Sequence, residues 1–489
     1  MNALQRDLKR LVPLAEKLGA GTVAADCHRQ HYHIQPPVGW LNDPNGLCCY
    51  DGAYHVFYQY SPFDASGGVK HWGHVRSTDL IHWEPLPVML YPDQPFDCHG
   101  AYSGSALVEN GALYLYYTGN VKHPGPYDYI TAGRGHNLCL AVSRDGVTLD
   151  SKQCLMYNRD YPSGLSCHVR DPKVFAWQGQ YYMVLGARTL TDRGEVLVLQ
   201  SADKLHWNHI NTLTTPEPFG YMWECPDLFC LDGRWYLLVS PQGIPCQNVY
   251  GCGYFALEGD WRTKDCTLGQ FYPLDSGFDF YAPQTFADEP HSRRILLGWM
   301  GMPDAPYGNQ ATVDCGWQHC MTLPRVLTRR ADGRLLQQPA PELLALRQKK
   351  HRPFSRSGAS AAQRPLCFAG PGQRQLCPAH RPRGRAALYP AGPPLRAALY
   401  RPGALRRTHS AGSPAGRCLP QPGCVGGCLL AGDLPQPGRS GVLHPVLPRR
   451  RAAGHPAGGS RRIRIRTRIT HTIYTRSKED ARYDPFFHW

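Results

Sequence analysis

Three acidic residues stand at or near the start of strand-like segments: Asp43 in WLNDPNG, Asp171 in HVRDPKVF and Glu224 in MWECPDLF. One Asp-Pro pair alone is ordinary turn chemistry. Three acids at equivalent places in separate repeats indicate a shared pocket, because the innermost strands of a radial β fold start around one centre. Two facing carboxylates are the groups that retaining glycoside hydrolysis uses, one as the nucleophile and the other, kept protonated, as the acid and base.

The neighbours of the three acids predict their roles. Glu224 follows a tryptophan, and less polar surroundings raise the pKa of a carboxyl group, so we expect it to be the acid/base. Asp43 follows Asn42 and can accept hydrogen bonds that keep it ionised, which suits a nucleophile. Asp171 follows Arg170 and should stay charged, which suits binding of sugar hydroxyls and stabilisation of an oxocarbenium-like transition state.

Repeated hairpins are the elements that must position these acids. Five segments share a short apolar run, a turn that in four of them has Gly at its tip, and a second run rich in aromatic and β-branched residues. They recur about every 55–70 residues, more widely than the strands of a sandwich. The pattern predicts an all-β, five-bladed β-propeller rather than a β-sandwich with similar hairpins. The segments begin at Asp43, Ser103, Asp171, Cys225 and Ala282.

The chain divides into four predicted parts. Leucines at three- and four-residue steps predict an amphipathic helix within an N-terminal extension, residues 1–29. Residues 30–330 form the predicted propeller, and residues 331–348 a linker with a short helix. Residues 349–489 are a tail of unusual composition.

The tail differs abruptly from the rest of the chain. Residues 349–489 contain 26 of the 53 Lys and Arg but only four acidic residues, with 17 Gly and 18 Pro. The segment is either an Arg/Pro/Gly-rich disordered tail that binds RNA or the product of a reading-frame shift, and the shift better explains the abrupt change. The first 348 residues carry 27 basic and 34 acidic residues, so they give no reason to expect a nucleic-acid partner.

The sequence also predicts the compartment. No apolar run approaches the roughly 18 residues of a membrane helix, and charges interrupt the first 20 residues where a signal peptide is apolar. We therefore expect a cytoplasmic protein without a membrane partner. Cysteines occur without the paired C-x-x-C spacing of a structural zinc site, so no metal is expected.

The order and spacing of four motifs resemble those of the β-fructosidases of glycoside hydrolase family 32. The motifs are WLNDPNG, YSGS at Tyr102–Ser105, RDP at Arg170–Pro172 and EC at Glu224–Cys225. Three further segments, GYMWECPDLF, GFDFYAPQTF and ILLGWMG, look most like the bacterial sucrose-6-phosphate hydrolases, or invertases, of that family. The resemblance covers about residues 30–348.

This resemblance implies a five-bladed propeller followed by a C-terminal β-sandwich. It also implies retaining cleavage of the terminal β-D-fructofuranosyl residue of sucrose 6-phosphate or sucrose, with no metal or organic cofactor. The nucleophile falls on Asp43, the transition-state stabiliser on Asp171 and the acid/base on Glu224. Residues 349–489 have about the length of the sandwich but lack its alternation.

The resemblance further implies a set of residues that contact a small sugar. Amide, hydroxyl and guanidinium groups give directional hydrogen bonds to a polyhydroxylated ring, and aromatic rings give flat apolar faces. The set is Trp40, Leu41, Asn42, Gln59, Trp72, Tyr102, Ser103, Arg170 and Trp299.

Two other functions fit the same pattern. The first is a five-bladed hydrolase that cleaves arabinan or xylan, although the WLNDPNG and EC motifs argue against it. The second is a catalytically impaired sugar-binding propeller or the product of a decayed gene. The intact acids argue against decay, whereas the tail argues for it.

Overall fold

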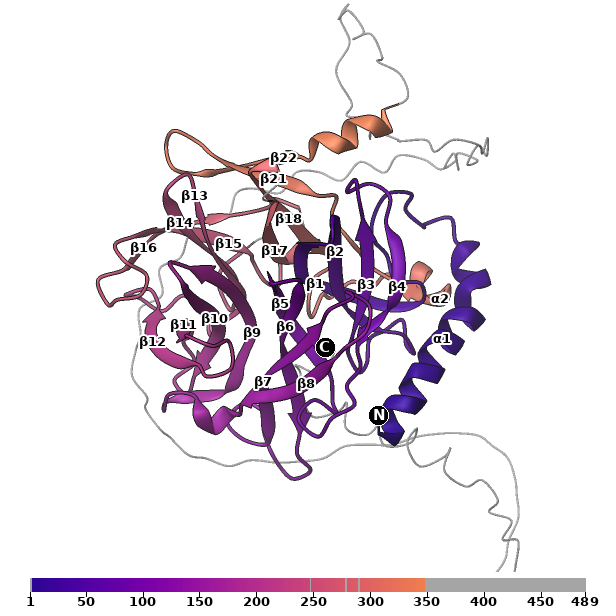
Figure 1. Ribbon diagram of the computed structural model, residues 1–489, viewed down its shortest axis with the longest axis horizontal. Coiled ribbons are helices and arrows are strands. Elements are labelled where there is room, and N and C mark those ends of the chain that lie inside the picture. The colour runs from indigo at the N-terminus through magenta and orange to yellow at the C-terminus, as the bar shows by residue number, and fades with distance from the viewer. Residues whose placement is uncertain (1, 247, 278, 289–290, 348–489) are drawn as a thin grey trace, which may run out of the picture. The chain divides into compact units, whose positions relative to one another are not determined.

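The computed structural model describes residues 2–347 except 247, 278 and 289–290 (Figure 1). The predictions of an aberrant tail, of RNA binding by it and of a missing β-sandwich concern residues 349–489 and lie outside the described residues.

Five sheets, antiparallel except for one short parallel pair in the first, make up most of the described chain. The strands of the first two sheets are β1 (Gly39–Tyr50), β2 (Ala53–Ser61), β3 (His71–Ser77), β4 (Glu84–Leu90), then β5 (Ala101–Glu109), β6 (Ala112–Lys122), β7 (Arg134–Ser143) and β8 (Ser151–Met156). Those of the third and fourth are β9 (Leu165–Trp177), β10 (Gln180–Thr189), β11 (Gly194–Ser201), β12 (Asn208–Leu213), then β13 (Met222–Leu231), β14 (Arg234–Gln242), β15 (Gly253–Glu258) and β16 (Thr267–Pro273). The fifth contains β17 (Tyr281–Asp288), β18 (Arg293–Met300), β20 (Cys320–Met321), β21 (Arg325–Arg329) and β22 (Leu335–Pro339).

Tight turns join the first two strands in four of the sheets. Both residues at each turn tip have positive φ, as in the hairpin turns that match the twist of antiparallel strands. The pairs are Asp51 and Gly52, Asn110 and Gly111, Gln178 and Gly179, and Asp232 and Gly233. The hairpins expected from the sequence are therefore present as the inner halves of the sheets.

The sheets form a closed ring. The first strands, β1, β5, β9, β13 and β17, each contact the next, and β17 returns to β1. The short strand β19 (Trp317–Gln318) pairs in parallel with β1, which joins a late segment of the chain to the first sheet. The prediction of an all-β, five-bladed propeller is confirmed.

Apolar side chains fill the space between neighbouring sheets. Leu113 and Leu115 of the second sheet pack with Phe57 and Trp72 of the first, for example, and all four are fully buried. Comparable clusters lie between the other neighbouring sheets. The buried apolar area between sheets holds the ring together.

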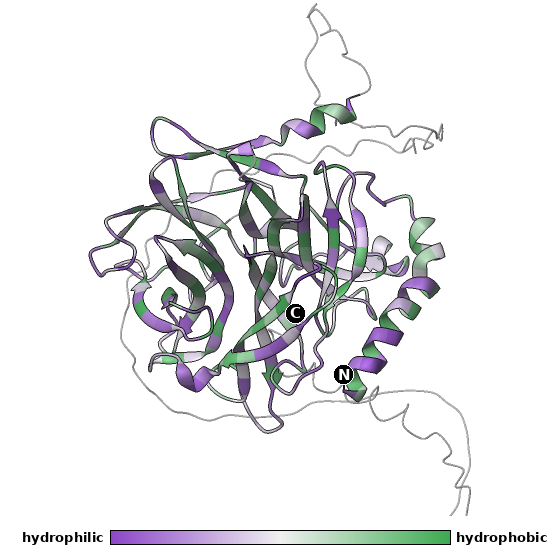
Figure 2. Cartoon of the chain, in the orientation of Figure 1, coloured by the Kyte–Doolittle hydropathy of each residue, from purple (hydrophilic) through white to green (hydrophobic). Residues whose placement is uncertain are grey.

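The N-terminal helix α1 (Ala3–Ala24) lies where the leucine spacing predicts a helix. The side chain of Asn2 caps it by accepting the backbone N–H of Gln5. The helix buries Val12 and Val23, whereas most of its leucines are exposed. Figure 2 shows hydrophobic and hydrophilic residues alternating along α1. No helix among the described residues is long and apolar enough to cross a membrane.

The segment predicted to be a linker contains a strand. β22 pairs with β21 and completes the fifth sheet. The turn between them has Gly333 with φ +81°, so an Asp-Gly turn signal marks this hairpin too. The remaining short elements are α2 (Gln310–Asp314), η1 (Asn158–Asp160) and η3 (Pro341–Leu346).

Close backbone contact between the third and fourth sheets predicts that Gly186 cannot be enlarged. A Cβ atom at this position would lie 1.9 Å from the carbonyl oxygen of Trp223. We expect Gly186→Ala to lower the free energy of unfolding by about 1–3 kcal/mol, because the sheets must separate to relieve the clash. Chemical denaturation measures this change.

The matched control is Gly21→Ala, because Gly21 lies in α1 and a Cβ atom there meets nothing within 4 Å. We expect that variant to be as stable as the wild type or slightly more stable, because alanine favours a helix. Equal stability of the two variants would contradict the proposed packing.

Candidate active site

A register shift interrupts the innermost strand of every sheet, and in four sheets it lies at or beside a residue predicted for the site. In such a bulge an extra residue bends the strand and redirects its side chains. The shifts span residues 41–44, 102–104, 170–173, 224–227 and 281–284. Asp171, Cys225 and Ala282 have positive φ at these places, at a cost on the order of 1–2 kcal/mol each for a residue with a Cβ atom.

The bulges surround an open cavity. Eight of the predicted site residues line it: Asn42, Asp43, Gln59, Tyr102, Arg170, Asp171, Glu224 and Trp299. The structure thus brings the three predicted acids together from β1, β9 and β13.

The other four predicted residues do not line this cavity. Trp40 lines a neighbouring one and donates from its ring nitrogen to Asn42. Ser103 lies behind Asp43 and donates to its carboxylate. Leu41 and Trp72 are fully buried, which corrects their prediction as sugar contacts. Trp72 faces the space between sheets and donates to the carbonyl of Tyr102, so it supports the wall from behind.

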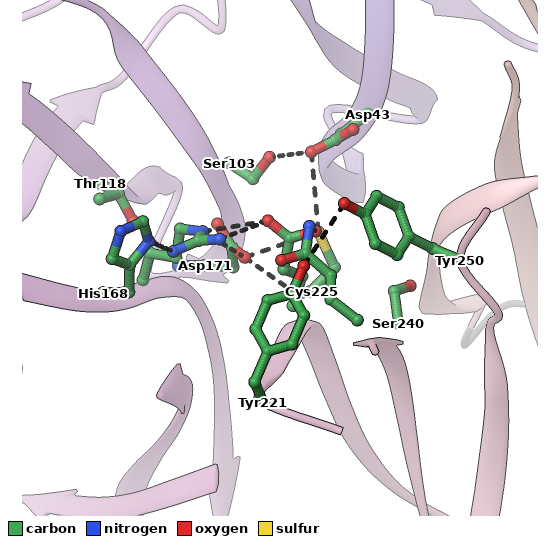
Figure 3. Close-up of polar contacts among 12 residues, drawn as sticks. Asp43, Ser103, Thr118, His168, Asp171, Tyr221, Cys225, Ser240 and Tyr250 are labelled. Carbon is green, nitrogen blue, oxygen red and sulfur yellow. Dashed lines mark hydrogen bonds and ion pairs between the residues drawn. The ribbon is translucent and has the colours of Figure 1, made fainter. Parts of the chain in front are cut away.

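Three side chains donate hydrogen bonds to Asp43. Ser103 Oγ lies 2.5 Å from a carboxylate oxygen, a bond drawn in Figure 3. Asn42 Nδ2 lies 3.1 Å and Gln59 Nε2 3.2 Å from the carboxylate oxygens. Burial nevertheless raises the pKa of Asp43, and the negative charge of Glu224 adds to this effect, whereas Ser103 and Asn42 oppose it. The sequence-based expectation counted the donors but not the burial of the carboxyl group.

Asp171 is fixed by its backbone and its neighbours. Its backbone N–H donates to Thr118 Oγ1 at 2.9 Å, and its carboxylate accepts the backbone N–H of Cys225 at 2.9 Å. Burial raises the pKa of Asp171 to about 7, although the positive charge of Arg170 opposes this rise. The sequence-based expectation counted the charge of Arg170 but not the burial of the carboxyl group.

Glu224 lies in a polar setting, not the less polar one expected beside Trp223. Its carboxylate accepts from Arg170 Nη2 at 2.5 Å, from Tyr281 Oη at 2.5 Å and from Gln242 Nε2 at 3.0 Å. The ring of Trp223 is fully buried on the other side of the strand, because successive side chains of a strand point to opposite faces.

A thiol lies between the acids. Cys225 Sγ is 3.6 Å from an oxygen of Asp43 and 3.7 Å from an oxygen of Asp171, and Figure 3 shows the thiol between these carboxylates. Glu224 is the residue before Cys225, so the bulge in β13 places the thiol and the third acid in one site. Asp43, Asp171 and Glu224 thus belong to one site.

Several cavity residues were missed by sequence reasoning. Tyr281 lies at the bulge of the fifth innermost strand and donates a hydrogen bond to Glu224. Asp43 and Glu224 lie at the bulges of their own strands, so the position of Tyr281 in the repeat could have identified it as a site residue. Lys70 gave no such signal. Its buried amine lies 4.9 Å from the Trp40 ring, and burial lowers the pKa of Lys70 to about 7 while the charge of Asp43 opposes this shift.

Comparisons with known proteins agree with the motifs. Residues 33–339 match the N-terminal domain of the glycosyl hydrolases of family 32. Sucrose-6-phosphate hydrolase of Bacillus subtilis (strain 168) is 45% identical over 336 residues, which are 67% of this chain and 68% of that protein. Sucrose-6-phosphate hydrolase of Klebsiella pneumoniae is 42% identical over 340 residues, covering 67% of this chain and 70% of that protein.

Solved structures show the same fold. A sucrose-6-phosphate hydrolase from Lactobacillus gasseri superposes with a TM-score of 0.63 at 33% identity, covering 69% of this chain and 68% of that one. The family 32 β-fructofuranosidase BmSUC1 of Bombyx mori gives a TM-score of 0.63 at 34% identity, covering 70% and 72%. The resemblance inferred from the motifs is confirmed, and the match favours it over the arabinan-cleaving propellers. Because the family match takes in more than half of the chain, the protein belongs to glycoside hydrolase family 32.

Proposed function

We propose that the protein hydrolyses sucrose 6-phosphate, and sucrose less efficiently, with retention at the fructosyl anomeric carbon. The observation that carries this proposal is the convergence of Asp43, Asp171 and Glu224 on one cavity. The relatives named sucrose-6-phosphate hydrolase support the substrate, as does their identity of 42–45% over two thirds of the chain.

In the first step Asp43 attacks the anomeric C2 atom of the fructosyl unit. The bond from C2 to the bridging oxygen breaks, and Glu224 gives its proton to that oxygen, so that glucose 6-phosphate leaves. The enzyme then carries the fructosyl unit as an ester of Asp43. In the second step Glu224 takes a proton from water, the water oxygen bonds to C2, and fructose and the Asp43 carboxylate are released.

Three side chains fix the position of the Glu224 carboxyl group. Arg170, Tyr281 and Gln242 all donate hydrogen bonds to it. Ionised Asp171 can bind sugar hydroxyls and stabilise the positive charge that develops on the ring.

We also propose a cytoplasmic location. All fourteen cysteines of the described residues are free thiols, including the exposed Cys27 and Cys246. Free exposed thiols persist in a reducing compartment.

The roles of Asp43 and Glu224 predict different losses on substitution. Asp43→Asn removes the nucleophile, so we expect kcat to fall by about 10⁴-fold or more on every fructoside. Glu224→Gln removes the acid, so we expect a loss of about 10²–10⁴-fold on sucrose 6-phosphate and a much smaller loss of the fructosylation rate on an aryl fructoside, whose leaving group needs no proton. Burst kinetics separate the two steps.

Proton NMR of the first product formed gives the anomeric outcome. Retention predicts β-fructofuranose before mutarotation. Initial formation of the α anomer, or wild-type-like turnover by Asp43→Asn, would contradict the mechanism.

The hydrogen bond from Ser103 predicts a pH dependence. This bond lowers the pKa of Asp43, so Ser103→Ala should raise it, and the acid limb of kcat/KM should move to higher pH by about one unit. Activity should therefore fall most on the acid side and least near neutral pH. Measurement of kcat/KM from pH 4 to 8 tests this.

Ser201→Ala is the matched control, because Ser201 is equally buried but bonds to the turn at Asp203, away from the cavity. We expect no shift of its acid limb. A uniform loss at all pH values in Ser103→Ala would show that Ser103 acts on position and not on the pKa of Asp43.

A further inference from the structure

We propose that Arg134 and Arg188 form the part of the cavity wall that binds the phosphate of the substrate and so select the phosphorylated disaccharide. Both side chains line the same cavity as Asp43 and Glu224. This inference rests on the proposed function, because it assigns residues to the phosphate of sucrose 6-phosphate.

Strand pairing places Arg188 beside the acid site. On β9, His168 and Arg170 are two residues apart and therefore share one face. On β10, Arg188 lies between the pairs Ala187 with Val169 and Thr189 with Leu165, so it faces the irregular stretch that contains His168. Arg134 is the first residue of β7 in the neighbouring sheet.

A neutral histidine lies among the arginines. Arg170 Nη1 donates to His168 Nδ1 at 2.6 Å, and His168 Nε2 therefore donates to the carbonyl of Tyr129 at 3.2 Å. Burial, followed by the positive charges of Arg170, Arg134 and Arg188, holds the pKa of His168 well below its usual value. Arg134 and Arg188 line the same cavity as Arg170 and His168, so three guanidinium groups and one neutral ring share this part of its wall.

Arg170 and Arg188 differ in how their charges are balanced. Arg170 forms ion pairs with Glu224 and Asp171, so its positive charge is balanced by these acids. Arg188 binds Asp192 through Nε and Nη2, and Asp192 is 65% exposed, so solvent screens this pair strongly. Arg188 Nη1 has no hydrogen-bond partner among the described residues, and the Tyr221 ring packs 4.7 Å from the guanidinium and fixes its plane.

The place of this wall suits the leaving half of the substrate. Asp43 marks the position of the fructosyl C2 atom, and Glu224 marks the bridging oxygen. From Glu224 the contacts run through Arg170 to His168, and Arg134 and Arg188 line the same cavity. A phosphate on the glucosyl unit lies on the far side of the bridging oxygen, and guanidinium groups match its oxygens in charge and geometry.

The test measures kcat/KM for sucrose 6-phosphate and for sucrose with the full-length wild type, Arg188→Gln and Arg134→Gln. Each substitution removes charge-assisted hydrogen bonds to the phosphate. We expect the ratio of the two kcat/KM values to fall by about 10- to 100-fold in each variant. Arg188→Lys keeps the charge without the planar fork and should give an intermediate ratio.

Arg144→Gln is the matched control, because Arg144 is 70% exposed and pairs with Asp150 outside the cavity. Its ratio should equal that of the wild type. Equal losses on both substrates in Arg188→Gln and Arg134→Gln, or an unchanged ratio, would overturn the proposal.

A binding measurement separates this inference from the proposed function. Calorimetry with glucose 6-phosphate and with glucose needs no turnover, and we expect the wild type to bind glucose 6-phosphate more tightly and both variants to lose that difference. If the wild type hydrolyses sucrose but binds the two sugars equally, the phosphate wall is wrong and the fructosidase assignment stands. If it hydrolyses neither disaccharide, the proposed function fails, and the calorimetry still tests whether Arg134 and Arg188 bind the phosphate.

Discussion

Convergence of three carboxyl groups on one cavity is the constraint on which the site depends. Burial raises the pKa values of Asp43 and Asp171, and the negative charge of Glu224 adds to both shifts. Three anions in one cavity without compensation would repel one another. Arg170 compensates by contacting both Glu224 and Asp171, so it holds the group together electrostatically. Its own charge is fixed, since a guanidinium does not lose its proton.

The fold meets this constraint through irregular strands. Regular pairing would alternate side chains between the two faces of each sheet, and the acids would then face neighbouring sheets. The bulges near Asp43, Asp171 and Glu224 interrupt that alternation and direct the carboxylates into the cavity. The apolar packing between sheets offsets the strain at the residues with positive φ. Stability of the ring and geometry of the site are therefore linked.

The sequence predicts the parts of this structure that local patterns encode. Asn-Gly and Asp-Gly turns indicate the hairpins, and acids near strand starts indicate a shared pocket. The surroundings of each acid depend on which way a bulged strand turns, which neighbouring residues do not reveal. For this reason the expectation of a less polar setting for Glu224 was wrong: Trp223 faces the core, and Tyr281, 57 residues later, donates to the carboxylate instead. Trp72 was misplaced because a buried aromatic residue and a sugar contact look alike in sequence.

Charge is distributed unevenly around the cavity. The carboxylates of Asp43 and Asp171 lie beside Cys225, whereas Arg170 contacts His168 in a part of the wall that also holds Arg134 and Arg188. Arg170 belongs to both groups, because it contacts Glu224 and His168. If His168 were protonated, a fourth cation would weaken the hold of Arg170 on Glu224. The neutral ring avoids this because it accepts a hydrogen bond from Arg170 and donates its own N–H to the carbonyl of Tyr129. The neutral histidine thus holds Arg170 in place through a hydrogen bond without adding a positive charge next to the Arg170–Glu224 ion pair.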